Sequence, residues 1–372
     1  MALATFVAFA AFFALTTGIG ISRTTSFAGF TAQGHVRHAA FKGLREDKPA
    51  TEVELERAVA ESAAAGAGSG KKKSIVTVAG RELALSNLGK VLYPEVGFSK
   101  GQVIDYYARV AEVLLPHLRG RPLTMKRYPD GVEGQHFYEK RCPAHRPEWV
   151  QTASIWSESH NEDIDFCVID DLPTLIWAAN LADLELHTSL SLAAEMDRPT
   201  AIVFDLDPGA PADILDCAQV ALWIRGLFEQ LGLRSVPKTS GSKGIHLHVP
   251  LNTEVSYEQT KPFAKAVAET LEAKFGDRVV ASMAKRKRSG KVLIDWSQNN
   301  RHKTTVSVYS LRAKPRPTVS TPLEWEELEA ALEADDAGCL VFDAAAVLRR
   351  VNEKGDLYAP LLSQRQRLPD ST

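Results

Sequence analysis

Three aspartates stand at the ends of apolar runs that have the length of buried strands. AIVFDLDPG (201–209) contains Asp205 and Asp207, and KVLIDW (291–296) contains Asp295. Side chains alternate along a strand, so Asp205 and Asp207 share one face. Carboxylates this close repel each other unless a cation lies between them, and hard divalent ions favour such oxygen ligands. The pattern predicts a two-metal site for phosphoryl or nucleotidyl transfer. The plainer alternative is that these are solvated aspartates at a strand end beside an Asp-Pro-Gly turn.

A segment rich in small residues lies between these two runs. In TSGSKGIHLHV (239–249), Ser240 and the glycines would let backbone N–H groups approach an anion, and Lys243 adds a positive charge. The spacing is not that of a Walker A loop. His246 and His248 are two residues apart on a predicted strand, so they share a face. They are either structural residues or a pair of transition-metal ligands. The alternative reading is a glycine-rich hairpin turn with an exposed lysine.

Short strands mixed with amphipathic helices must position these residues. Ser99 is a suitable N-cap for a helix over 100–118, and the 201–206 strand is apolar enough to be buried on both faces. Strands with hairpins between them favour an α+β sandwich over a doubly wound sheet. The predicted strands are 74–78, 81–85, 123–128, 135–140, 165–168, 201–206, 235–238, 245–250, 292–296 and 304–310, and the predicted helices are 53–66, 100–118, 173–180, 212–231, 257–275 and 323–334.

Composition is that of an ordinary globular protein. Of 372 residues, 44 are Lys or Arg and 46 are Asp or Glu, for a net charge of −2, so any surface for nucleic acid must be local. Basic residues do gather at 119–127, 285–291 and 301–316, and Phe137 and Tyr138 offer a stacking platform or belong to the core. The four cysteines form no CxxC pair, which argues against a zinc ribbon or a disulfide framework and fits a reducing compartment.

The first 73 residues differ in character from the rest. Residues 6–21 are apolar and uncharged, without the basic residue that usually precedes a signal sequence, and they are short for a membrane span. We expect residues 1–40 to be a leader outside the fold, with export or membrane insertion as a minor alternative. GAGSGKKK (66–73) reads as a flexible linker that ends at a domain boundary.

Taken together, the motifs resemble those of the archaeo-eukaryotic primase superfamily and, more closely, the polymerase domain of bacterial ligase D. The similarity extends from about Leu83 to Leu362. It rests on LSNLGKVLYPEVGFSKGQVIDYY, RPLTMKRYPDGVEGQHFYEK, LADLELHTSLS, FDLDPG, TSGSKGIHLHVPL and DWSQNNRHKTTVSVYSLRAK, all in the expected order. The resemblance implies a primase-type fold of two packed α/β modules with mixed sheets, and an active site in the groove between them.

The resemblance also implies a role for each motif residue. Two divalent metal ions, Mn²⁺ favoured or Mg²⁺, would be bound by Asp205, Asp207 and Asp295. The incoming nucleotide would be held by His187, Ser240, Lys243, His246 and Arg312. A 5′-phosphate at a DNA gap or break would bind to Asn87, Lys90 and Lys100. Phe137 and Tyr138 would stack on the template, although the second position is often Phe in relatives. We assign no role to His248 or Gln298.

FKGLREDKP (41–49) resembles the end of the ligase domain that precedes the polymerase in some of these enzymes, yet the chain has no KxDG adenylation motif. The expected organisation is therefore a leader at 1–40, a ligase-tail remnant and linker at 41–73, the primase-polymerase domain at 74–362, and a tail at 363–372. We expect a cytoplasmic, nucleoid-associated enzyme that acts on gapped or broken DNA with NTP or dNTP, prefers ribonucleotides, and works with Ku and a separate ligase in non-homologous end joining.

Two other functions use the same residues. A two-metal nuclease or phosphoesterase could employ the same aspartates, with some support from the His-x-His pair. The Lys243 loop suits a triphosphate better than a scissile diester. A non-catalytic module that binds DNA ends would not need all three carboxylates. Templated nucleotidyl transfer is therefore the favoured prediction.

Overall fold

The computed structural model describes residues 22–30, 36–45, 73–158 and 161–369. The chain divides into two compact units, residues 1–70 and 71–372. In the first, β1 (Ser22–Phe30) and β2 (Val36–Arg45) pair as an antiparallel hairpin. The helix predicted at 53–66, nearly all of the linker at 66–73, and much of the predicted leader lie outside the described residues.

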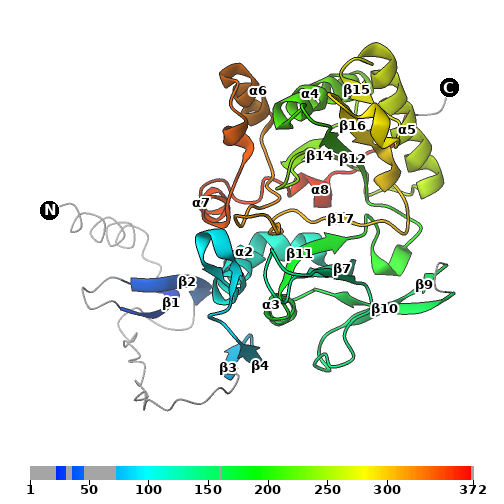
Figure 1. Cartoon of the computed structure of the whole chain (residues 1–372). Coiled ribbons are helices and arrows are strands. Elements are labelled where there is room, and N and C mark those ends of the chain that lie inside the picture. The colour runs from blue at the N-terminus through cyan, green and yellow to red at the C-terminus, as the bar shows by residue number, and fades with distance from the viewer. Residues whose placement is uncertain (1–21, 31–35, 46–72, 159–160, 370–372) are drawn as a thin grey trace. The chain divides into compact units, whose positions relative to one another are not determined.

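The second unit contains a six-stranded antiparallel sheet with the order β17-β11-β7-β10-β9, where β8 also pairs with β7. Helices α2, α3 and α7 share one apolar core with this sheet, and Figure 1 shows α2 and α3 beside β7 and β11. Its elements are α2 (Lys100–Leu118), β7 (Pro122–Arg127), β8 (Phe137–Glu139), β9 (Thr152–Ser157), β10 (Glu162–Val168), α3 (Leu172–Asn180), β11 (Asp183–Thr188), β17 (Thr305–Val306) and α7 (Ala344–Lys354).

A five-stranded sheet with the order β13-β14-β12-β16-β15 forms the other half of this unit. All its pairs are antiparallel except β15 with β16, so the sheet is mixed. Helices α4, α5 and α6 share a second apolar core with it (Figure 1). Its elements are β12 (Ala201–Pro208), α4 (Ile214–Gln230), β13 (Val236–Thr239), β14 (Ile245–Pro250), α5 (Tyr257–Lys274), β15 (Val279–Val280), β16 (Val292–Asp295) and α6 (Trp325–Ala334).

Small hairpins, one short α-helix and the 3₁₀-helices η2 to η6 complete the described part of the unit. The hairpins and the α-helix are β3 (Lys73–Val78) with β4 (Arg81–Ser86), β5 (Val91–Tyr93) with β6 (Phe98–Ser99), and α8 (Pro360–Ser363). Most of the predicted elements are present within a few residues. Ser99 is the N-cap of α2, where its side chain accepts from the Gln102 backbone N–H and the Gln102 side chain accepts from the Ser99 backbone N–H. Within this unit the predictions missed β5, β6, β9, β11, β15, α7 and α8, and the strand predicted at 304–310 is only Thr305–Val306.

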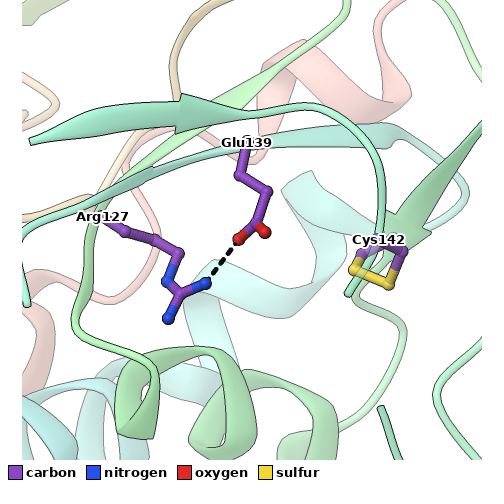
Figure 2. The surroundings of a disulfide bond; sticks show 4 residues. Arg127, Glu139 and Cys142 are labelled. Atoms are coloured by element: carbon purple, nitrogen blue, oxygen red, sulfur yellow. Dashed lines mark hydrogen bonds and ion pairs between the residues drawn. A yellow bond between two sulfur atoms is a disulfide. The ribbon is translucent and has the colours of Figure 1, made fainter. Parts of the chain in front are cut away.

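A disulfide joins Cys142 and Cys167, although the scattered cysteines argued against a disulfide framework. Cys142 follows β8 and Cys167 lies on β10, and the Cys142 backbone N–H donates to the Asp165 carbonyl at 2.7 Å. This backbone contact brings the two Cα atoms to 4.8 Å, a normal disulfide distance. Figure 2 shows the bond beside the Arg127–Glu139 ion pair, which links β7 to β8 at 2.6 Å. No helix among the described residues is long and apolar enough to cross a membrane.

Candidate active site

Three of the predicted site residues form one row across the five-stranded sheet. Asp205 on β12 is the register partner of both Asp295 on β16 and His246 on β14, and His246 is in turn opposite Lys238 on β13. Side chains of register partners point to the same face. Lys238, His246, Asp205 and Asp295 are therefore neighbours in that order, and His246 Nε2 lies 3.2 Å from Asp205 Oδ1.

The alternation along β12 separates this row from the core. Phe204 and Leu206 are fully buried in the core shared with α4 and α5. Asp205 and Asp207 therefore point to the opposite face, as the sequence predicted. That face is turned toward the six-stranded sheet, because the buried Lys238 ammonium donates to the Val306 carbonyl of β17 at 3.1 Å. The predicted carboxylates thus lie between the two halves of the unit.

The electrostatic surroundings of Asp205 and Asp207 differ. Burial alone would raise the pKa of Asp205, but His246, Lys238 and Arg312 outweigh it and lower that pKa. Burial raises the pKa of Asp207, and the nearby charge of Asp205 raises it further. A carboxyl whose pKa is raised by a neighbouring carboxylate is one that a divalent cation would stabilise in its charged form.

Asp295 is tied to the turn that follows it. Its Oδ1 accepts from the Ser297 backbone N–H at 2.9 Å and from the Ser297 hydroxyl at 2.6 Å, while its Oδ2 accepts from Gln298 at 3.0 Å. Each carboxylate oxygen has further lone-pair capacity for a cation. Within the described part of the chain, no three His, Cys, Asp or Glu side chains are already gathered closely enough to hold a metal ion.

The predicted phosphate loop follows β13 directly. The Ser240 hydroxyl accepts from the backbone N–H groups of Ser242 and Gly244, both at 3.2 Å, so it shapes the turn itself. A Cβ on Gly241 would lie 2.6 Å from the Val319 carbonyl carbon, and one on Gly244 would lie 2.0 Å from the Leu206 carbonyl oxygen. Close approach of the chain to itself therefore demands glycine at both positions. Lys243 is exposed at the tip.

Arg312 connects the loop to the other sheet. Its guanidinium donates to the Ser240 carbonyl, and its Nε lies 3.4 Å from Glu185 Oε2 on β11. His187, two residues after Glu185 and on the same strand face, places Nε2 at 3.1 Å from that same oxygen. Burial lowers the pKa of His187 despite the adjacent Glu185 carboxylate. The structure thus brings Arg312, His187 and Ser240 together.

Sequence reasoning missed Glu185 and Lys238. Glu185 lies in the LELH stretch and Lys238 precedes the phosphate loop, and both are buried, with exposed fractions of 1%. For Glu185 the sequence offers only a charge between two leucines, Leu184 and Leu186, and for Lys238 only its place next to the predicted phosphate loop. Their partners come from segments distant in sequence, which no local pattern reveals.

The predicted 5′-phosphate residues form a second cluster. Asn87 has φ +54°, and its carbonyl accepts from the Lys90 N–H at 2.9 Å, while the Lys90 carbonyl accepts from the Lys100 N–H at 2.8 Å. Lys100 is buried at the start of α2, and its ammonium donates to the Ser86 carbonyl at 2.7 Å. Burial, with the charges of Lys90 and Arg127, lowers the pKa of Lys100 to about 8.

The two aromatic residues on β8 are at the surface. Phe137 is 43% exposed and Tyr138 is 57% exposed, so neither belongs to the core. The Arg127 guanidinium lies 5.2 Å from the Phe137 ring centroid, and the Lys126 ammonium lies 5.3 Å from that of Tyr138. Exposed rings beside cations are suited to stack on nucleic-acid bases. Tyr138 also meets His187 edge-on, with 5.8 Å between ring centroids.

Two packed halves, one with an antiparallel sheet and one with a mixed sheet, and aspartates on adjacent strands between them define an α+β protein of primase type. A family profile described as "LigD, primase-polymerase domain" matches residues 99–358. The polymerase domain from Mycobacterium tuberculosis ligase D, solved in complex with DNA, aligns with TM-score 0.70 and 38% identity, over 76% of this chain and 99% of that one. The chain belongs to the LigD primase-polymerase domain family.

Curated relatives agree with this assignment. The multifunctional non-homologous end joining protein LigD of Mycolicibacterium smegmatis is 42% identical over 280 residues, which are 74% of this chain and 36% of that protein. The protein of the same name from Pseudomonas aeruginosa is 33% identical over 356 residues, 92% of this chain and 40% of the relative. The chain therefore spans well under half the length of these relatives.

Proposed function

We propose that this chain is a primase-polymerase directed to DNA gaps and ends, which adds nucleotides, preferably ribonucleotides, to a primer 3′-hydroxyl. The observation that carries the proposal is the row of Asp205 and Asp295 on adjacent strands, beside a lysine-bearing loop that Arg312 contacts. The carboxylates would bind the metal ions that assist the transfer. The neighbouring cations would bind the phosphates that are transferred and released.

The donor set of Asp205, Asp207 and Asp295 consists of hard oxygens, which fits two Mn²⁺ or Mg²⁺ ions. When bound, such ions would lower the pKa of the attacking hydroxyl and neutralise charge on the triphosphate. The chain's own residues have complementary tasks. Lys243, at the exposed tip of its loop, would neutralise phosphate charge. Arg312 and His187 would orient the triphosphate from the side of the six-stranded sheet, and Ser240 and His246 would line the opposite side.

We further propose that Asn87, Lys90 and Lys100 bind the 5′-phosphate of a gap, and that Phe137 and Tyr138 stack on the template base nearby. Clustered cations recognise a terminal phosphate, and exposed rings accept any base. We place the catalytic domain at residues 74–362. By analogy with the relatives' names, the proposed setting is non-homologous end joining, in the bacterial cytoplasm, with Ku and a separate ligase as partners.

Primer extension on a gapped DNA tests the proposal. The comparison uses rNTP and dNTP, a gap with and without a 5′-phosphate, and Mn²⁺, Mg²⁺ or EDTA. We expect metal-dependent addition of ribonucleotides that is faster with the phosphate. Shortening of the primer would instead favour the hydrolase, and tight phosphate-dependent binding without extension would favour a non-catalytic recruitment module.

A further inference from the structure

Glu185 is a buried acid among the cations proposed to hold the nucleotide. It lies in the middle of β11, where its neighbours Leu184 and Leu186 point into the apolar core. The alternation therefore turns Glu185 and His187 to the opposite face, toward Arg312. An ionised carboxylate at 1% exposure is costly unless its charge is compensated.

Both oxygens of Glu185 are fully engaged. Oε2 lies 3.1 Å from His187 Nε2 and 3.4 Å from both Arg312 Nε and Lys126 Nζ. Oε1 accepts from the Ala313 backbone N–H at 3.0 Å and from the Tyr128 hydroxyl at 3.4 Å. Burial would raise the pKa of Glu185, but the contact with His187 and the charges of Arg312 and Lys126 lower it well below its usual range. The group is therefore an anion throughout the neutral pH range.

The position of Arg312 depends on this anion. Its guanidinium contacts both halves of the unit in different ways. Nη1 donates to the Ser240 carbonyl at the start of the phosphate loop, whereas the buried Nε forms an ion pair with the Glu185 carboxylate on β11 without the geometry of a hydrogen bond. A free arginine side chain samples many rotamers, and fixing it costs conformational entropy at each binding event. Because two contacts already restrict the Arg312 side chain in the folded protein, less of this entropy is lost when the nucleotide binds. The remaining N–H donors also point in a defined direction.

If only net charge mattered, Glu185 would weaken nucleotide binding instead of supporting it. A carboxylate beside a triphosphate repels it, so a site built only for attraction would omit this residue. We propose that Glu185 is a positioning residue, which holds Arg312 and His187 in the geometry that receives the phosphates of the nucleotide. This inference rests on the proposed function and deepens it. The sign of the effect of neutralising Glu185 separates positioning from simple electrostatics.

The test is Glu185→Gln, assayed for nucleotide KM and kcat on a gapped DNA and for nucleoside triphosphate Kd by titration. Positioning predicts that KM and Kd rise roughly tenfold, with a smaller change in kcat, because the buried charge that pairs with Arg312 is lost. A fall in KM and Kd, the electrostatic outcome, would overturn the proposal, as would no change. Glu327→Gln is the matched control, because Glu327 also pairs with an arginine, Arg350, but lies on α6 in the other half of the unit.

A double-mutant cycle tests the route through Arg312. In an Arg312→Ala background, Glu185→Gln should raise Kd by much less than it does alone, because the residue being positioned is gone. Equal effects in both backgrounds would refute the route through Arg312.

Thermal unfolding and binding to a phosphorylated gap establish that each variant is folded. If the unmutated protein binds triphosphate but does not extend a primer, the proposed function fails while the Kd comparison still decides the role of Glu185. If the unmutated protein binds no triphosphate, both fail.

Discussion

Asp205 on β12 and Asp295 on β16 are register partners, although 90 positions separate them in the sequence. The pairing converts two isolated strand-end aspartates into neighbours on one face of one sheet. His246, on the other side of Asp205, closes the row toward Lys238. A catalytic reading of these aspartates depends on this pairing, because a lone aspartate after a strand is more often an exposed turn residue.

Recognition of a 5′-phosphate should depend on pH through Lys100. The pKa of this buried ammonium is about 8, so it is charged below that pH and neutral above it. The ratio of affinities for phosphorylated and unphosphorylated gaps should therefore fall between pH 7 and pH 9. Lys100→Arg should flatten this dependence, because a guanidinium stays protonated. A ratio in the unmutated protein that is constant over this range would contradict the assignment.

Phe137→Ala should weaken binding to a gapped template by about 1–3 kcal/mol, the usual contribution of one stacked base. Tyr138→Phe should have little effect, because the exposed ring and not the hydroxyl provides the stacking face. Fluorescence anisotropy with a labelled gapped DNA measures both variants. Loss of affinity in Tyr138→Phe comparable with that in Phe137→Ala would indicate that the hydroxyl, and not the ring, makes the contact.

The disulfide should contribute to stability. It closes a loop with a sequence separation of 25, for which restriction of the unfolded chain predicts about 3 kcal/mol. A dithiol reductant, or the double variant Cys142→Ser with Cys167→Ser, should lower the free energy of unfolding by roughly that amount. Cys217, which is buried and unpaired, provides the control, since Cys217→Ala should respond to the reductant as the unmutated protein does. Identical denaturant midpoints with and without the reductant would show that the bond contributes nothing.

Packing requires glycine at position 244 in the predicted phosphate loop. Gly244→Ala would place a Cβ 2.0 Å from the Leu206 carbonyl oxygen, and the resulting shift of the loop should cost about 1–3 kcal/mol of unfolding free energy. Gly226, inside α4, has no atom within 4 Å of an added Cβ, so Gly226→Ala should stabilise by up to about 1 kcal/mol. Denaturant unfolding compares the two. Equal effects would contradict the close approach at Gly244.

Features that depend only on residues close together in the sequence were predicted correctly. Strand alternation placed Asp205 and Asp207 on one face, and Ser99 as a suitable N-cap predicted the start of α2. The resemblance to a known family supplied roles for Arg312 and His187 that no spacing contains. Neither source revealed Glu185, because its contacts with Lys126 and Arg312 join three separate segments.

The pairing of Cys142 with Cys167 was likewise missed. It depends on a backbone contact between Cys142 and Asp165, which exists only once β10 has taken its place in the sheet. The structure has only the short strand β17 where a longer strand was predicted at 304–310, and contacts between residues distant in sequence explain this difference as well. The Ser307 backbone N–H still donates to the Leu186 carbonyl of β11 at 2.8 Å. Beyond it, the Tyr309 N–H donates to the Ser320 carbonyl and the Ser310 carbonyl accepts from the Ser320 N–H, so these residues no longer pair with β11 through their backbone. Non-local pairing of this kind is not encoded in periodicity.

The most direct measurement is single-nucleotide extension of a 5′-phosphorylated gapped DNA by Asp205→Asn and by the control Asp277→Asn, with Mn²⁺ present. Asp277 is exposed and lies outside the row of site residues. We predict that Asp205→Asn loses extension by at least about a hundredfold, as expected when a group that stabilises transition-state charge is removed. Its affinity for the DNA and the activity of Asp277→Asn should stay close to those of the unmutated protein. Normal extension by Asp205→Asn would contradict the assignment of these carboxylates to catalysis.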